Sequence, residues 1–479
     1  MNEDTNYFGF DLKPQQQLAF SNLTRFAKGT SEKVFLLKGY AGTGKTTLMS
    51  GFLKWLNCNN IHAFVLASTG RAAKIISDKT NTPARTVHSQ IYKFRDLNED
   101  LDRISQSIDH AADSTGQLSL LFDMVPLESA AESRLYIIDE SSMISDQIEK
   151  NTSFARFGTG ELLGDLFEYD PVGRFIFVGD PGQLPPVGQA ISPALNKSYI
   201  EEKYQCSVFE IELTEIVRQS ESNGIIVASM LLRKLYASNP PVKYASFPLK
   251  NQSNIILHNS DIELLNEYID RIKRFGLEYA TLLCISNRLC EHFNRNVRMA
   301  LGKMGNRIDV GDLLMVTQNN YLTDLVNGDL VVVNQIGIRE YRCGLSFLKV
   351  EVKELVSNSL HRILLIEDVL YSNATNLNEN QHRFLFVDYY KRMQKLGIKQ
   401  KDKAFKDNML KDPYLNALRA VYGFALTCHK SQGGEWEEVF LYMDTKIQGV
   451  PRPYVYQWVY TAVTRARKTL HIVNDIFIR

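Results

Sequence analysis

The sequence predicts an α/β protein with two layers of parallel strands and two inserted subdomains. A glycine-rich phosphate-loop pattern lies between an apolar strand and a helix, and further apolar strands end in polar residues. Short continuous apolar runs are typical of parallel strands that are buried on both faces. Two regions interrupt this rhythm, at 91–130 and 331–420. We therefore expect the first layer in 1–90 and 131–212 and the second layer in 213–330 and 421–479.

Composition limits the classes of protein that the chain can belong to. Its 479 residues, 44% of them hydrophobic, suffice for several domain cores. No run approaches 18 apolar residues, and the first residues lack the basic and apolar regions of a signal peptide, so we expect a cytoplasmic protein without membrane contact. The net charge is +1, so a polyanion would have to bind in a local groove. The six cysteines show neither metal-ligand spacing nor a disulfide pattern.

The strongest motif lies at residues 39–47, where Gly-Tyr-Ala-Gly-Thr-Gly-Lys-Thr-Thr matches G-x-x-x-x-G-K-[ST]. In such a loop the backbone N–H groups turn toward phosphate oxygens, the lysine reaches the β- and γ-phosphates, and the next hydroxyl can ligate magnesium. A dinucleotide fold is disfavoured because no third glycine follows at the required offset. The residues predicted to contact a nucleotide here are Gly39, Ala41, Gly42, Thr43, Gly44, Lys45, Thr46 and Thr47.

Two carboxylates follow the apolar run 135–138, where a phosphate-loop fold places its second site. Asp139 would hold the magnesium shell together with Thr46. Glu140 would orient or deprotonate the water that attacks the γ-phosphate, so the pair favours hydrolysis over transfer. Gln183 stands in a proline-rich turn that would hold it as a sensor of the γ-phosphate, although a plain turn is the alternative.

Polar and basic residues also follow other strands, where open α/β sheets bind ligands. Thr69, Arg71 and Lys74 come after the strand at 63–67, and Thr86 and His88 lie at a later turn. These side chains could contact a phosphate backbone, with turn capping as the alternative for Thr86 and His88.

The second layer offers two arginines, Arg218 and Arg465, toward a nucleotide that the first layer holds. This is the arginine-finger arrangement, in which the positive charge offsets charge that develops on the γ-phosphate. Thr427, His429 and Lys430 stand together before the strand at 439–443. They form a second polar cluster that could contact a ligand.

The two insertions have different patterns. In 91–130 we expect two short strands, at 91–94 and 118–123, around an acidic helix marked by Leu97, Leu101, Ile104 and Ile108. Residues from about 335 to 370 alternate as in a small β-barrel. The basic stretch 391–411 is ordinarily a solvated face, with contact to a nucleic-acid duplex as the alternative.

Taken in order, these motifs resemble those of superfamily 1 helicases of the 5′-to-3′, RecD-like branch. The matching segments span nearly the whole chain: 39–46, 68–74, 86–89, 139–140, 179–187, 213–218, 427–433 and 460–467. The resemblance implies two RecA-like lobes with ATP and magnesium between them. It also implies that 91–130 is a hairpin that splits duplex and that 331–420 is an SH3-like β-barrel with a helical extension.

The resemblance gives roles to further residues. It implies that Gln16 contacts adenine, although a lone glutamine on a surface helix is usually solvated. Gln183 would couple the nucleotide to the strand, Arg218 and Arg465 would be the fingers, and Gly434 and Glu435 would lie at the nucleotide. Phe94 and Phe122 are candidates for the separating tip, with a core role as the alternative. The implied single-strand contacts are Thr69, Arg71, Lys74, Thr86, His88, Asn287, Thr427, His429 and Lys430.

The resemblance implies an ATP-dependent DNA helicase that translocates from 5′ to 3′ on single-stranded DNA and unwinds duplex. The expected partners are single-stranded DNA and duplex junctions, with RNA open as an alternative polymer, and the expected active form is a monomer. The rival function is an ATP-controlled nucleic-acid clamp or remodelling factor without unwinding. Both functions share every motif, so the 91–130 insertion is the feature that separates them.

Overall fold

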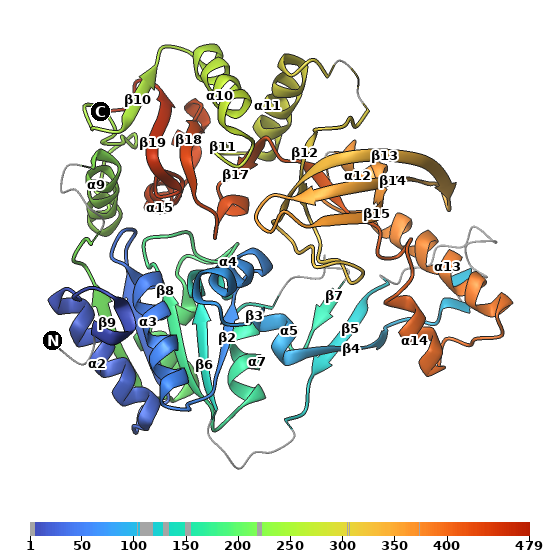
Figure 1. Cartoon of the computed structure of the whole chain (residues 1–479), viewed down its shortest axis with the longest axis horizontal. Helices are drawn as coiled ribbons and strands as arrows, with labels where there is room; N and C mark the ends of the chain where they lie inside the picture. Colours follow the sequence, from blue (N-terminus) through green and yellow to red (C-terminus); the bar gives the residue numbers. More distant parts are fainter. Residues whose placement is uncertain are drawn as a thin grey trace.

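A computed structural model describes residues 5–102, 104–105, 118–127, 134–148, 155–217, 223–303, 305, 307–372 and 374–479. It contains two parallel sheets with their helices, and two smaller sheets beside them (Figure 1). The mixed α/β class is therefore confirmed. Within the described ranges, no helix is both long enough and apolar enough to cross a membrane.

The first sheet and its helices, which we call the first lobe, hold the phosphate-loop motif. The strand order is β3-β2-β6-β8-β1-β9, and all neighbours are parallel. The strands are β1 (Val34–Gly39), β2 (Ala63–Ala67), β3 (Ala84–Thr86), β6 (Leu135–Asp139), β8 (Arg174–Gly179) and β9 (Val208–Leu213). The helices are α1 (Thr5–Phe8), α2 (Pro14–Lys28), α3 (Lys45–Cys58), α4 (Gly70–Thr80), α5 (Val87–Ile91), α7 (Leu162–Tyr169) and α8 (Lys197–Tyr204).

Buried apolar side chains fill both faces of this sheet, with α2 and α3 on one face and α7 and α8 on the other. The strand register pairs Ala67 with Asp139 and Lys38 with Gly179. Because these strands are parallel and end together, the residues that follow them meet at one edge. This edge therefore positions the phosphate loop, the acidic pair and the turn after β8.

The second sheet and its helices, the second lobe, have the order β10-β19-β18-β11-β17, again parallel. The strands are β10 (Ile255–His258), β11 (Ala280–Cys284), β17 (Ala425–Thr427), β18 (Trp436–Tyr442) and β19 (Ala466–Val473). The helices are α9 (Gly224–Ser238), α10 (Asp261–Phe275), α11 (Asn287–Ala300) and α15 (Tyr454–Val463). One large apolar core joins these elements.

An antiparallel sheet of order β15-β14-β13-β12-β16 forms the larger insertion. The elements are β12 (Leu313–Val316), β13 (Leu330–Arg342), β14 (Leu345–Glu354), β15 (Leu360–Ile366), α12 (Glu367–Leu370), α13 (Glu379–Lys395), α14 (Lys403–Met409) and β16 (Ala420–Tyr422). Leu418 bridges Leu365 of β15, so the two edges approach one another as in a small barrel. The sheet begins at β12, before the expected boundary at 331, because β12 pairs with β13 and β16.

The smaller insertion contains β4 (Tyr92–Leu97), β5 (Leu120–Met124) and β7 (Ala155–Phe157). β4 and β5 form the expected antiparallel pair, whereas β7 is parallel to β5 and lies outside the expected range. Leu97 ends a strand, so its assignment to the helix was wrong. Leu101 and Ile104 are helical, and Ile108 lies outside the described residues. Phe94 and Phe122 are half-buried, and their rings are in edge-to-face contact with the centroids 5.6 Å apart. This packing supports their core role.

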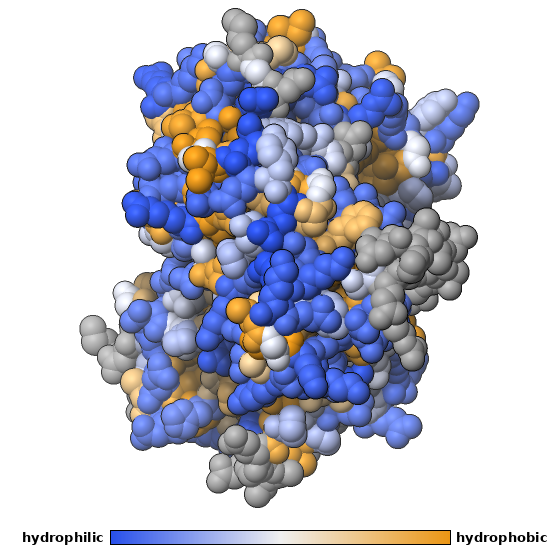
Figure 2. Space-filling model, turned by 90° about the vertical axis from the view of Figure 1, so that its right-hand side faces the viewer, coloured by the Kyte–Doolittle hydropathy of each residue, from blue (hydrophilic) through white to orange (hydrophobic). Residues whose placement is uncertain are grey.

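The two insertions share one hydrophobic core. Leu97, Leu101 and Ile104 of the smaller insertion are buried together with Tyr390 and Phe405 of the larger one. Polar contacts extend the junction, since the Leu101 N–H donates to Gln400 Oε1 at 2.8 Å and Lys406 Nζ donates to the Arg95 carbonyl at 2.7 Å. Figure 2 views the molecule from this side and shows a mainly hydrophilic surface with small, separated hydrophobic patches.

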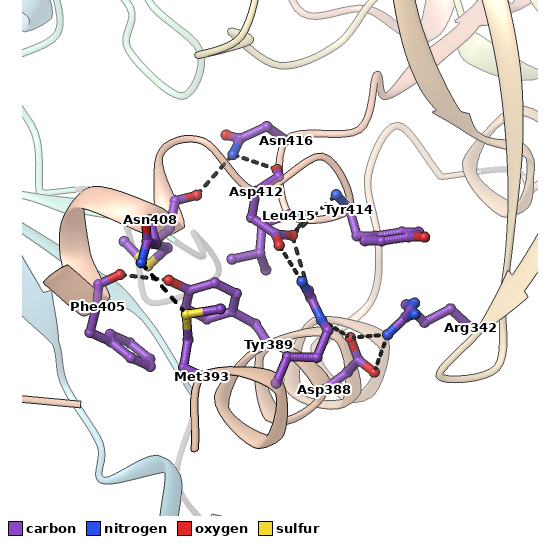
Figure 3. Close-up of polar contacts among 12 residues, drawn as sticks. Arg342, Asp388, Tyr389, Met393, Phe405, Asn408, Asp412, Tyr414, Leu415 and Asn416 are labelled. Carbon is purple, nitrogen blue, oxygen red and sulfur yellow. Dashed lines mark hydrogen bonds and ion pairs between the residues drawn. The ribbon is translucent and has the colours of Figure 1, made fainter. Parts of the chain in front are cut away.

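A network of charged residues anchors α13 to the antiparallel sheet (Figure 3). Arg392 donates to Asp388 at 2.9 Å and to Asp412 at 3.1 Å, and Asp388 also accepts from Arg342 of β13 at 3.0 Å. The Asp412 carboxylate accepts a hydrogen bond from the Leu415 N–H at 2.9 Å, and this bond holds the chain in place before β16. Arg392 belongs to the basic stretch 391–411, so part of that stretch forms internal contacts.

Candidate nucleotide and nucleic-acid site

The phosphate loop joins β1 to α3 and requires glycine at two positions. Gly42 and Gly44 have φ values of 82° and 81°, which side chains other than glycine rarely adopt. A Cβ at Gly44 would also lie 2.4 Å from the Gln16 amide nitrogen. Lys45 Nζ donates to the carbonyl oxygens of Gly39 at 2.6 Å and Tyr40 at 3.1 Å, so its charge lies at the loop. This cation and the first N–H groups of α3 suit a phosphate.

Asp139 and Glu140 lie at the carboxyl end of β6, where Lys45 acts on both carboxyls. Burial raises the pKa of Asp139, and burial together with the Asp139 charge raises the pKa of Glu140 to about 7. Glu140 has a φ of 50°, a strained conformation for a residue other than glycine and one that clusters at functional sites. A carboxyl with a pKa near 7 can accept a proton at neutral pH.

The second lobe brings an arginine to this pair. Arg465 is 4% exposed and donates to the carbonyl oxygens of Thr461 at 3.1 Å and Gly434 at 3.2 Å. Its charge lowers the pKa of Glu140, so the guanidinium acts on that carboxyl across the junction of the lobes. Arg218, the other expected finger, lies outside the described residues.

Glu435 lies near the surface, and its contact with the nucleotide stays a prediction. Its carboxylate forms an ion pair with Arg467 at 3.1 Å, and both side chains are more than a third exposed, at 35% and 41%. Gly434, by contrast, contacts Arg465 directly. Of these two predicted residues, only Gly434 is hydrogen-bonded to Arg465, the residue of the second lobe whose charge acts on Glu140.

Gln16 of α2 lies against the phosphate loop. Its side chain is 2% exposed, its Oε1 accepts from the Lys13 N–H at 3.3 Å, and its Nε2 donates to the Thr43 carbonyl at 3.3 Å. The alternative of a solvated glutamine is therefore wrong. Contact with adenine stays a prediction.

The turn after β8 connects the lobes. Asp180 accepts a hydrogen bond from the Tyr460 hydroxyl at 2.6 Å, and that hydroxyl accepts one from the Ala41 N–H of the phosphate loop at 3.1 Å. The Gln183 side-chain oxygen is buried without a hydrogen-bond partner among the described residues. A buried acceptor of this kind needs a donor from water or a ligand, which fits the predicted sensor role.

Two contacts to the phosphate loop were not predicted from the sequence. The Arg233 guanidinium of α9 lies 3.3 Å from the ring centroid of Tyr40, and Tyr460 of α15 contacts Ala41. Burial, with a hydrogen bond to Glu212, raises the pKa of Tyr40, so its hydroxyl stays protonated. The sequence could have indicated the role of Tyr460, because this residue begins the motif 460–467. Arg233 belongs to no motif, so nothing in the sequence marks it as a contact of the phosphate loop.

A cavity of about 380 Å³, which we call the interlobe cavity, lies between the lobes. Both lobes contribute residues of the predicted nucleic-acid set to it: Thr69, Arg71, Thr86, His88, His429 and Lys430. Thr69 Oγ1 and Thr86 Oγ1 accept backbone N–H groups at 3.2 and 3.1 Å, so both hydroxyls cap helices. The capping alternative is thus confirmed for Thr86, which also lines the cavity.

Two histidines of the interlobe cavity are neutral. Burial lowers the pKa of His88 to about 4 and also lowers the pKa of His429. The His88 ring packs edge-on against Phe157, with the ring centroids 5.0 Å apart, and His429 Nε2 lies 2.8 Å from the Tyr454 hydroxyl. Neutral rings contact a nucleic acid by packing and hydrogen bonding and not by charge.

Arg71 and Lys74 link α4 to other parts of the fold. Arg71 is 8% exposed, donates to the Gly328 carbonyl at 3.3 Å and lies 4.9 Å from the Trp436 ring centroid. Lys74 forms an ion pair with the buried Asp329. Arg71 also lines the interlobe cavity, whereas Lys74 does not. Lys74 thus joins the first lobe to the larger insertion.

Asn287 and Thr427, the remaining predicted contacts, line a larger neighbouring cavity. That cavity also contains Lys430, so it adjoins the interlobe cavity. The structure therefore brings the predicted nucleic-acid residues into two connected spaces, with the exception of Lys74.

Two protein families match the sequence in the order of the lobes. The AAA domain family matches residues 11–239, which contain the phosphate loop and the acidic pair. The UvrD-like helicase C-terminal domain family matches residues 422–473, which contain Thr427 and Arg465. Each match thus covers one side of the nucleotide site.

Three curated relatives differ in how much of their length this chain spans. An uncharacterised protein of Methanocaldococcus jannaschii is 24% identical, over 99% of this chain and 39% of that protein. An uncharacterised protein of Acanthamoeba polyphaga mimivirus is 24% identical, over 95% of this chain and 98% of that protein. The ATP-dependent DNA helicase dda of Enterobacteria phage T4 is 28% identical, over 44% of this chain and 40% of that protein.

Solved structures of Pif1 helicases align along nearly the whole chain. The Bacteroides protein in complex with ADP-AlF3 and ssDNA is 17% identical, with a TM-score of 0.48, and 98% of this chain and 94% of that chain are covered. The Candida albicans protein is 16% identical, with a TM-score of 0.44 and coverages of 98% and 95%. The phosphate loop and the acidic pair lie in the AAA match, Arg465 lies in the helicase C-terminal match, and part of the sequence is similar to dda, so the chain resembles superfamily 1 helicases of the 5′-to-3′ branch.

Proposed function

We propose that this chain is an ATP-dependent DNA helicase that translocates from 5′ to 3′ on single-stranded DNA and unwinds duplex. The observation that carries the proposal is the position of both sites at one junction. Lys45 of the first lobe and Arg465 of the second both act electrostatically on Glu140, and the interlobe cavity lies between the same lobes. A movement of the lobes would therefore change the nucleotide site and the grip on the strand together.

The residues present fit ATP and a magnesium ion. The N–H groups of residues 42–47 and the Lys45 ammonium suit phosphates, and Gln16, which we assign to the adenine, lies against the same loop. The Thr46 hydroxyl and the Asp139 carboxylate are oxygen ligands of the type that magnesium prefers. When bound, the ion supplies charge that offsets the phosphates. Glu140 takes the proton of the attacking water, and Arg465 offsets charge that develops on the γ-phosphate.

The domain assignment follows the strand pairing. We assign the first RecA-like lobe to 1–90 and 131–212 and the second to 213–330 and 421–479, with β12 and β16 moved to the larger insertion and β7 to the smaller one. The approach of Leu418 to β15 supports an SH3-like barrel, and α13 and α14 form its helical extension. The antiparallel pair β4 and β5 supports a hairpin in the smaller insertion.

The shared core changes the test of that hairpin. Deleting 95–117 would remove Leu97, Leu101 and Ile104 from a core that α13 and α14 also use, so loss of activity would follow from misfolding. Leu101→Ala is the sharper variant. We expect the cavity to lower the unfolding free energy by about 2–5 kcal/mol. We further expect unwinding to fall several-fold, while ATPase activity stimulated by single-stranded DNA persists.

Denaturant unfolding, ATPase assays and strand displacement on a forked duplex measure these effects. Leu360→Ala is the control, because Leu360 is 58% exposed on β15 of the larger insertion, with which Leu101 shares its core. Equal loss of ATPase activity and unwinding would contradict a role of the insertion in strand separation.

Direction is the most specific consequence of the proposal. We expect a duplex with a 5′ single-stranded tail to be unwound when ATP and magnesium are present, and a blunt duplex or one with only a 3′ tail to be a poor substrate. Strand displacement with the three substrates measures this. Efficient unwinding from a 3′ tail alone would contradict the direction. ATP turnover stimulated by single strands without any displacement would favour the rival clamp.

A further inference from the structure

The phosphate loop contacts the second lobe through two consecutive residues, Tyr40 and Ala41. Both pack against the apolar core of the second lobe, although the loop that carries them belongs to the first. The Ala41 N–H donates to the Tyr460 hydroxyl at 3.1 Å, and the Arg233 guanidinium of α9 lies over the Tyr40 ring, 3.3 Å from its centroid. The position of the loop therefore depends on side chains of the second lobe.

The backbone carbonyl of Tyr40 holds several other groups of the loop. It accepts hydrogen bonds from Lys45 Nζ at 3.1 Å, from Thr43 Oγ1 at 2.8 Å and from the Thr43 N–H at 3.2 Å. Lys45 Nζ also donates to the neighbouring Gly39 carbonyl at 2.6 Å. Because the lysine of such a loop reaches the β- and γ-phosphates, a shift of Tyr40 would move the group that contacts them.

The Tyr40 ring gives Arg233 a fixed surface to contact. Its hydroxyl is hydrogen-bonded to Glu212 of β9, and β9 pairs with β1, where Leu213 lies opposite Gly39. The first lobe thus holds the ring at its hydroxyl end and at its backbone, and the second lobe contacts its face. A guanidinium over the face of an aromatic ring is attracted by the ring electrons, and more strongly where water is excluded.

Arg233 is a half-buried cation that the described residues do not neutralise. Within the described ranges, it forms neither an ion pair nor a hydrogen bond, and its charge acts on Tyr40. Arg271 of the same lobe, by contrast, forms ion pairs with Glu267 at 2.7 Å and Glu438 at 3.2 Å. The contact of Arg233 is with a ring of the opposite lobe, so it depends on how the two lobes are placed.

We propose that Arg233 is a positioning residue for ATP hydrolysis, which acts through Tyr40 to hold the phosphate loop and Lys45 in place when the lobes are together. This rests on the proposed function, because it requires that the loop binds ATP. Arg465 acts on Glu140, whereas Arg233 acts on the loop, so the second lobe contributes two arginines with separate roles. The first lobe keeps its own nucleotide contacts without Arg233, so its loss affects turnover more than affinity.

Steady-state ATP turnover with saturating oligothymidylate, together with equilibrium nucleotide titration, tests the proposal. We expect Arg233→Gln to lower kcat about 5- to 30-fold, the range of a desolvated cation–π contact, with little change in KM for ATP. Arg233→Lys keeps a cation over the ring and should recover part of the loss. Lys234→Gln is the matched control, because Lys234 is the next residue of α9 and is exposed, and it should turn over ATP normally.

Substitutions of Tyr40 test the same contact from the first lobe. Tyr40→Leu should lower kcat by a factor similar to that of Arg233→Gln. The double variant should lose no more than either single variant, because both changes remove one shared contact. Tyr40→Phe keeps the ring and removes only the hydroxyl that is bonded to Glu212, so it should lose far less than Tyr40→Leu.

Thermal unfolding shows whether each variant is folded, and Tyr40→Leu still tests the contact if Arg233→Gln does not fold. Normal turnover in Arg233→Gln, a loss that appears only in KM, or additive losses in the double variant would overturn the positioning role. If the unmodified chain does not hydrolyse ATP, the proposed function itself fails.

Discussion

We expect Glu140→Gln to hydrolyse ATP at least about 10²-fold more slowly than the unmodified chain. The amide has the shape of the carboxylate but cannot take a proton from water. Burial and the Asp139 charge raise the pKa of the Glu140 carboxyl to about 7, the range of an effective base at neutral pH. Lys45 and Asp139 remain in place, so nucleotide binding is expected to persist. Steady-state turnover and equilibrium nucleotide titration measure the two quantities.

The same carboxyl predicts a pH profile. Below about pH 7 Glu140 is protonated and inactive as a base, and above it the ionised form is present, so kcat/KM should rise with pH through that region. Glu140→Gln should lack this rise. Glu168→Gln is the matched control, since Glu168 is exposed on α7 of the same lobe. Near-normal turnover in Glu140→Gln would refute the assignment.

Arg465→Ala is expected to lower turnover by about 10³-fold or more with only a small loss in nucleotide affinity. The guanidinium lies in the second lobe and acts on Glu140 in the first, so its charge would matter most when the γ-phosphate is transferred to water. Lysine at this position should restore little, because it lacks the fork that donates to Thr461 and Gly434.

Because Arg465 is buried and bonded, its removal also needs a folding control. Thermal unfolding should show a cooperative transition in the variant, and nucleotide titration should show a filled site. Arg467→Ala, which removes an exposed arginine paired with Glu435 and Glu437, should keep near-normal turnover. An unchanged rate together with weakened folding in Arg465→Ala would make Arg465 a structural residue.

The nucleotide site was largely predictable because its parts are local in sequence. Few residues besides glycine adopt the left-handed conformation of Gly42 and Gly44, so the glycine spacing in the sequence identifies the loop. Asp139 ends a parallel strand, and such ends meet at one edge of a sheet whatever the order of the strands. Arg465 was found from its motif, and the structure brings it to Glu140.

Predictions failed or ran out where partners are far apart in sequence. The ion pair of Lys74 with Asp329, 255 residues later, was not predicted, and the contact of Lys74 with DNA stays a prediction. Leu97 was assigned to a helix from apolar spacing alone, whereas pairing with Leu120 makes it part of a strand. Arg233 carries no motif, and its stacking on Tyr40 depends on how the two lobes meet.

The sequence by itself determined the α/β class, the phosphate loop and the acidic pair, because backbone rules and short-range spacing suffice for these, and the order of its motifs gave the resemblance to the superfamily. Only the tertiary structure decided the core shared by the two insertions, the larger cavity lined by Asn287 and Thr427, and the contacts between the lobes. Each of these features joins segments that are far apart in the sequence. The apolar and polar pattern of each segment is accounted for by its own helix or strand, so it does not indicate the segment that it contacts. Burial and charge at such junctions arise only once the sheets are placed beside one another.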